Sequence, residues 1–198
     1  MKLKLIAAVA LAAAGTANAA INPGTATTEG GEMILSVWDN ATQSSYTLDL
    51  GIDTRSFNDN QSYVFDLSAD QNWLTYKLEN NAELSTSKWD VTASDKGSVP
   101  GPNGLALTAQ VGTDNIITSQ GFGVYTTLQT NIENYALAVN TDANYAVDES
   151  TFIVGGSYAG STGTQAILAN LSNVAGNYGD SMDYWMLTSD KNGRTKVA

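Results

Sequence analysis

Short runs in which apolar and polar residues alternate set the strongest limit on the fold of this chain. Between Gly31 and Gly51 two such runs, 33–38 and 46–50, flank the polar stretch DNATQSS. Alternation with a period of two places successive side chains on opposite faces of a strand, and a polar stretch of this kind forms a turn. The segment is therefore predicted to be a β-hairpin.

Similar runs recur along the rest of the chain. Strands are predicted at 61–67, 88–94, 105–111, 151–155 and 182–188, with a short final piece at 194–197 after the turn SDKNG. The pattern at 165–174 is compatible with a helix or a strand.

Two segments have helical spacing instead. The stretch SADQ at 68–71 has the form of a capping box, and Leu74 and Leu78 follow it four residues apart, which predicts a helix over about 68–79. A second helix is predicted over about 120–140, with Ser119 as its N-cap. Its apolar face comprises Val124, Leu128, Ile132, Tyr135 and Val139.

These elements indicate the fold class. Many short strands with two inserted helices, at about 68–79 and 120–140, are typical of a mainly β, β-sandwich or jelly-roll-like domain. We assign 32–198 to a single β-rich domain of this kind.

The first residues have the features of a bacterial secretory signal. Lys2 and Lys4 precede the apolar run LIAAVALAAA, and Ala17-Asn18-Ala19 fits a small-x-small cleavage site. We therefore expect residues 1–19 to be removed and the protein to be secreted, extracellular or at the cell surface. The next segment, 20–31, is small, polar and turn-rich, and it is expected to form a flexible leader.

Charge and missing residue types exclude several functions. The chain has a formal net charge of −11, and removal of the signal takes away two lysines and no carboxylate, giving −13. Such a chain has no basic patch for nucleic acid, and no segment after the signal is long and apolar enough to span a membrane. The absence of cysteine and histidine excludes disulfides, the common zinc sites and His-based catalysis.

The remaining chemistry is carried by oxygen ligands. No spacing singles out a catalytic pair of carboxylates, and most aspartates lie in turns, where they hydrogen-bond their own backbone. We therefore expect no enzymatic activity, with a carboxylate-based glycan hydrolase as the weakest alternative. Catalytic and cofactor-binding residues are predicted to be absent and metal ligands stay unassigned, although the turns 58–60 and 190–193 have oxygens suited to Ca²⁺.

The tryptophans leave a second function open. Trp38, Trp73, Trp89 and Trp185 could stack on sugars in a cell-surface glycan-binding module, whereas in a cysteine-free sandwich they more often form the core.

Four stretches carry a resemblance to known proteins. VWD…SYTLDLG after the signal, WDVTASD, YALAVN and DYWMLTSD resemble uncharacterised exported surface or matrix proteins of proteobacteria. That group is related to proteins with a Pro-Glu-Pro C-terminal sorting signal, a tail that this chain lacks. The resemblance implies export and surface or matrix residence, and it transfers no catalytic residue.

The hairpin and the leader together suggest a structural role. A leader followed by an uncharged apolar strand is what β-strand addition between subunits requires. We predict a secreted subunit of an extracellular filament or biofilm matrix that assembles with itself. The candidate subunit-contact strand comprises Met33, Ile34, Leu35, Val37 and Trp38.

Overall fold

The computed structural model describes eleven parts of the chain. They are residues 2–3, 20–25, 30–57, 61–80, 84–95, 104–114, 122–142, 150–155, 159, 174–189 and 195–197. The apolar core of the predicted signal, both turns considered for Ca²⁺, the predicted cap Ser119 and the ambiguous stretch 165–173 lie outside the described residues.

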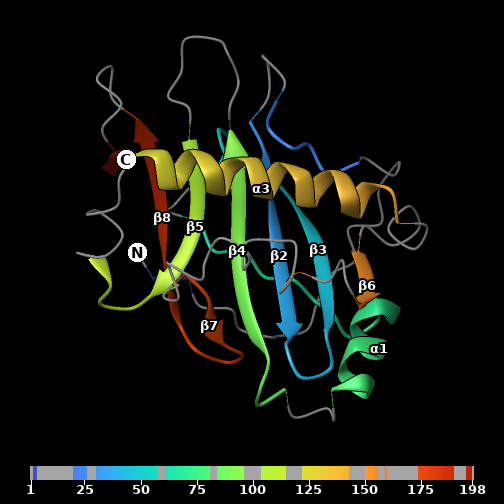
Figure 1. The fold of residues 1–198 in the computed structure, drawn as a ribbon. Helices are drawn as coiled ribbons and strands as arrows, with labels where there is room; N and C mark the ends of the chain where they lie inside the picture. Colours follow the sequence, from blue (N-terminus) through green and yellow to red (C-terminus); the bar gives the residue numbers. More distant parts are fainter. Residues whose placement is uncertain are drawn as a thin grey trace.

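The described strands form one antiparallel sheet (Figure 1). Along the main path the order is β1 (Lys2–Leu3), β8 (Met182–Ser189), β5 (Gly104–Gln110), β4 (Lys88–Asp95), β2 (Glu32–Asp39), β3 (Ser44–Asp53) and β6 (Ser150–Val154). Two short strands lie off this path: β7 (Gly176–Asn177) pairs with β4, and β9 (Thr195–Val197) pairs with β8.

Two longer helices accompany the sheet. Helix α3 (Phe122–Asn140) runs across one face, roughly at right angles to the strands, and α1 (Gln71–Glu79) lies beside β6 (Figure 1). The predicted fold class, a mainly β, β-sandwich-like domain with two helices, is confirmed. The predicted strands at 33–38, 46–50, 88–94, 105–111, 151–155 and 182–188 correspond to β2, β3, β4, β5, β6 and β8.

The first hairpin follows the alternation of its sequence. β2 and β3 pair from Asp39↔Ser44 to Ile34↔Asp49, around the turn at 40–43. Met33, Leu35 and Val37 belong to one core cluster, whereas Ile34 and Trp38 belong to the other. Because β2 has a core on each face, its side chains are almost all buried.

The prediction of a strand at 61–67 is wrong. These residues form no sheet ladder. Tyr63, Phe65 and Leu67 are half-buried while Val64 and Asp66 are exposed, and Phe65 and Leu67 pack against the core opposite α3. The alternation therefore reflects the packing of one side of the segment against the sheet. It does not indicate strand pairing.

The start of α1 also differs from the prediction. The helix begins at Gln71, and its N-cap is Asp70, whose carboxylate accepts a hydrogen bond from the Trp73 amide at 3.0 Å. Ser68 lies in a turn before the cap, where its amide bonds to Asp66. The capping box read at 68–71 is thus replaced by a single Asp cap two residues later.

The long helix is confirmed together with its predicted face. Leu128, Ile132, Tyr135 and Val139 are buried in the layer between α3 and the sheet, and Val124 packs against that layer. Polar contacts fix the helix across the strands: Glu133 accepts a hydrogen bond from Ser94.

Candidate functional site

The strand predicted to contact a neighbouring subunit lies in the interior of the sheet. β2 pairs with β3 on one side and with β4 on the other, from Ile34↔Thr92 to Trp38↔Lys88. All five candidate residues are at most 2% exposed. In a single copy of the chain Met33, Ile34, Leu35, Val37 and Trp38 therefore do not line an open edge.

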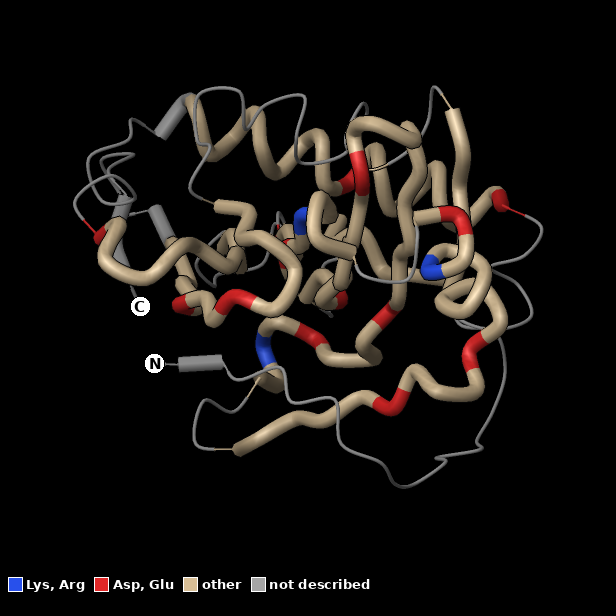
Figure 2. Tube along the Cα trace, turned by 90° about the horizontal axis from the view of Figure 1, so that it is seen from below, with Lys and Arg blue, Asp and Glu red and all other residues tan. Residues whose placement is uncertain are grey.

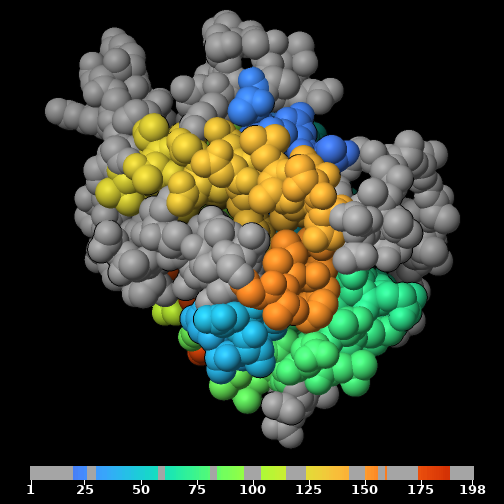
Figure 3. Space-filling view, turned by 45° about the vertical axis from the view of Figure 1, so that its right-hand side comes forward, coloured from blue at the N-terminus to red at the C-terminus, as the bar shows by residue number. Residues whose placement is uncertain are grey.

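The leader is docked against its own chain through Ile21. The Ile21 side chain is 1% exposed and belongs to the core layer beneath α3. The side-chain amide of Asn140, at the end of α3, accepts from the Ile21 N–H at 2.8 Å and donates to the Ile21 carbonyl at 3.0 Å. Figure 3 shows residues 20–25, in blue, lying against α3. The Asn140 side chain thus hydrogen-bonds both backbone polar groups of Ile21.

A second pair of contacts joins the leader to the start of β2. Glu32 donates its amide to the Asn22 carbonyl at 3.0 Å, and the Glu32 carboxylate accepts from the Asn22 amide at 2.5 Å. Further on, Gly30 donates to Asp53 at 2.8 Å. Asn22 therefore lies beside the start of β2, and Gly30 lies beside the end of β3.

Two glycines permit this close approach. A Cβ at Gly31 would lie 1.7 Å from the Ser94 carbonyl oxygen, and one at Gly24 would lie 1.9 Å from the same atom. Gly24 also has φ +75°, a conformation that favours glycine. The end of β4 and the leader are in contact here only because neither glycine has a side chain.

The outer edge of β8 is covered unevenly. β9 pairs with Leu187, Thr188 and Ser189, whereas Lys2–Leu3 pairs with Asp183 and Met182. Between them, 184–186 have no strand partner on this side among the described residues. Since Lys2–Leu3 belongs to the predicted signal, its removal would extend this uncovered edge to 182–186.

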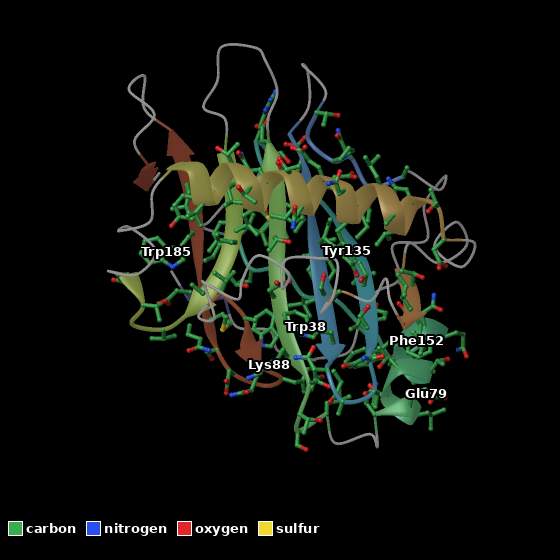
Figure 4. The ribbon with its side chains drawn as sticks, viewed as in Figure 1. Trp38, Glu79, Lys88, Tyr135, Phe152 and Trp185 are labelled. Carbon is green, nitrogen blue, oxygen red and sulfur yellow. The ribbon has the colours of Figure 1, made fainter. Side chains whose placement is uncertain are left out.

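A row of polar side chains crosses the sheet beneath α3. The register makes Asp90, Ser36, Thr47 and Thr151 successive neighbours on β4, β2, β3 and β6, and each is at most 2% exposed. Tyr135 reaches this row from α3 and shares a 2.5 Å hydrogen bond with the Thr47 hydroxyl. Figure 4 shows Tyr135 over the middle of the sheet.

The environment of Tyr135 opposes ionisation. Burial raises the pKa of the Tyr135 phenol to about 12, and the nearby Asp90 carboxylate acts in the same direction, although the Thr47 hydrogen bond partly offsets both. The phenol therefore keeps its proton at neutral pH and stays hydrogen-bonded to Thr47, which holds the helix over the row.

The described aspartates mostly have local structural partners. Asp39 bonds the amides of Ala41 and Thr42, and Asp49 bonds that of Gly51. Asp95 holds Arg55 in a two-point ion pair, with Nε–Oδ2 at 2.7 Å. Figure 2 shows acidic residues spread along the trace. Within the described ranges no group of three potential metal ligands is found.

The tryptophans are mainly core residues. Trp38, Trp73 and Trp89 are 0%, 6% and 2% exposed, and Trp185 is half-buried against the layer beneath α3. Half-exposed rings are found instead near the 61–67 segment. Phe57 stacks on Tyr63 at 5.6 Å and contacts Tyr184 at 4.7 Å, as measured between ring centroids.

Sequence reasoning missed both residues that anchor the leader. Ile21 is the only large apolar residue between Ala20 and Glu32, which is a recognisable signal for an anchor in a polar segment. Asn140 ends a helix and has no distinguishing pattern, so its pairing with Ile21, 119 positions away, follows only from the fold.

Neither described helix is long and apolar enough to cross a lipid bilayer. No family model matches the chain, and no curated protein or solved structure is significantly similar to it.

Proposed function

We propose that this protein is an exported structural subunit that assembles with itself by β-strand addition into an extracellular filament or biofilm matrix. The observation that carries the proposal is the outer edge of β8. Once the predicted signal is removed, residues 182–186 pair with β5 on their inner side and have no strand partner on their outer side among the described residues. An unpaired row of N–H and C=O groups binds an extended segment of another chain.

The composition of this edge supports the role. Natural sheets protect exposed edges with lysine, proline or bulges. The run MDYWM at 182–186 contains neither lysine nor proline, and Asp183 is its single charge. Its five residues equal the length of an ordinary strand.

The opposite edge of the sheet is better covered. Helix α1 packs beside β6, and the Asn72 side-chain amide donates to the Ser150 carbonyl at 3.0 Å. One edge is thus partly blocked while the other accepts a strand, which favours addition at β8.

Electron microscopy and light scattering of residues 20–198 test the proposal. Filaments or oligomers that grow with protein concentration are the expected result. A single monomer peak at every concentration, with and without Ca²⁺, would exclude assembly.

Proline substitutions then locate the contact. N–H groups of an edge strand point alternately inward and outward, so of Tyr184 and Trp185 one donates toward β5 and the other outward. Tyr184→Pro and Trp185→Pro are each compared with alanine at the same position, which keeps the N–H. The proline at the outward position should block assembly relative to its alanine control while the monomer stays folded. If both folded proline variants assemble like their controls, β8 is not the contact.

Glycan binding is the second candidate. The half-exposed Phe57–Tyr63 pair is a surface on which a sugar ring could stack. Glycan-array binding that is lost in Tyr63→Ala and kept in Val64→Ala would support it, and an array without any bound glycan would contradict it.

A further inference from the structure

We infer that the site occupied by residues 20–25 is a docking site that also accepts the same segment from a second copy of the chain. The inference rests on the proposed function, since it names the segment through which assembling copies hold one another. It uses a surface at the end of α3 and the end of β4, away from the β8 edge.

The docked segment has the features of a peptide in a binding site. Its anchor side chain, Ile21, is buried, and both backbone polar groups of that residue bond to Asn140. The next residue, Asn22, pairs with Glu32 through its carbonyl and its amide. Ser94 lies against Gly24 and Gly31 without room for a side chain. Within residues 21–24, the segment therefore buries an apolar side chain, pairs its backbone polar groups and requires a glycine.

The segment is joined to the domain by a short connection. Residues 26–29, ATTE, link the docked part to Gly30 and Gly31. An exchanged leader makes the same contacts with the neighbour that it makes within its own chain, so exchange costs association entropy and no contact energy. High local concentration within an assembly held at β8 offsets that entropy.

Exchange gives each copy one segment to donate and one site to fill. When the donation is not reciprocal, the contact is head to tail and extends from copy to copy. A continuing assembly can therefore be held by two independent contacts, the β8 edge and the exchanged leader.

The absence of cysteine makes a thiol test specific. Asn22→Cys and Glu32→Cys are made as separate full-chain variants, purified after signal removal, mixed, and oxidised with oxidised glutathione. A disulfide between position 22 of one chain and position 32 of another, enriched in the assembled fraction, reports a leader docked beside the β2 strand of a different copy. The two positions are close enough for it, because the Asn22 carbonyl accepts from the Glu32 amide at 3.0 Å. Asn22→Ser and Glu32→Ser control for the lost hydrogen bonds.

The expected result is a linked pair of the two variants in the assembled fraction, identified by mass spectrometry after isotopic labelling of one of them. Assembled material without 22–32 links between chains would overturn the leader exchange and leave the proposed function standing. If the mixture, the matched serine variants and the wild-type chain all stay monomeric, both the leader exchange and the proposed function are overturned.

A double variant provides a second readout. Asn22→Cys combined with Glu32→Cys, oxidised as a dilute monomer, pins the leader to its own chain. The pinned protein should lose most of the leader-dependent assembly and regain it upon reduction. Equal assembly in the oxidised and reduced forms would contradict exchange of the leader.

Discussion

At the scale of single residues, the buried polar row shows how α3 is positioned over the sheet. Asp90, Ser36, Thr47 and Thr151 occupy one line across four strands, and the Tyr135 hydroxyl reaches that line from the helix. Hydrophobic burial alone would let a helix slide along a sheet, whereas a buried hydrogen bond fixes one register because an unmade bond costs about 1–3 kcal/mol. Tyr135 therefore fixes the position of α3 on the sheet and also stabilises the packing between them.

Tyr135→Phe tests this position through the pH dependence of unfolding. The wild-type pKa is raised to about 12, so the folded protein keeps a proton that the unfolded chain loses above about pH 10. Stability present below that pH is therefore lost as the pH rises from about 10 to about 12, by on the order of 3 kcal/mol. The variant should be about 1–2 kcal/mol less stable at pH 7 and lose less stability across that window, as measured by urea unfolding.

Tyr63→Phe serves as the control for Tyr135→Phe, because that ring is half-exposed and outside the layer beneath α3. A Tyr135→Phe protein with an unchanged alkaline profile would show that this phenol does not resist ionisation.

Ile21→Ala tests whether the leader contributes to the fold. The substitution empties a buried position, which costs about 2 kcal/mol or more for an isoleucine. Val64→Ala removes an exposed side chain and should change stability by less than about 0.5 kcal/mol. Equal thermal midpoints for the two variants would mean that Ile21 is not anchored.

At the scale of elements, the sequence predicted what depends on local pattern. The alternation of the first hairpin and the repeated apolar face of α3 each describe one side of one element, so they can be read from neighbouring residues. The segment 61–67 shows the limit of such patterns. Tyr63, Phe65 and Leu67 alternate because one side lies on the sheet, and periodicity cannot distinguish this arrangement from strand pairing.

The start of α1 allows a matched test at the same scale. Asp70 caps the helix through the Trp73 amide and also accepts from the Tyr46 hydroxyl at 2.6 Å, which connects α1 to β3. Asp70→Ala should therefore lower the unfolding free energy by about 1–2 kcal/mol. Asp66→Ala removes an exposed aspartate that bonds the backbone and the side chain of Ser68, two residues along the chain, and it should cost clearly less. Chemical denaturation of both variants measures the difference, and equal losses would assign the cap to another residue.

At the scale of the whole molecule, the order of the strands was beyond prediction. β8 and β5 lie at one side of the sheet and β3 and β6 at the other, with β4 and β2 between them although β2 is among the first strands of the chain. The candidate contact strand was predicted from its apolar, uncharged sequence. That composition equally describes a strand with a core on both faces, and only the topology distinguishes the two arrangements.

The net charge of the molecule sets a last, global prediction. After removal of the signal each copy carries a formal charge of −13, so approaching copies repel one another. Salt screens this repulsion, since the screening length falls from about 30 Å at 10 mM to about 8 Å at 150 mM ionic strength. Assembly of residues 20–198 should therefore strengthen as NaCl is raised over this range, with several-fold more sedimenting material at a fixed protein concentration. Contacts formed mainly by ion pairs would weaken over the same range, so assembly that falls with salt would contradict backbone pairing as its basis.

Comparing CaCl₂, MgCl₂ and NaCl at equal ionic strength separates screening of the net charge from specific binding of a cation. Equal effects of Ca²⁺ and Mg²⁺ are expected from screening, whereas a much larger effect of Ca²⁺ alone would assign a specific calcium site to the assembly.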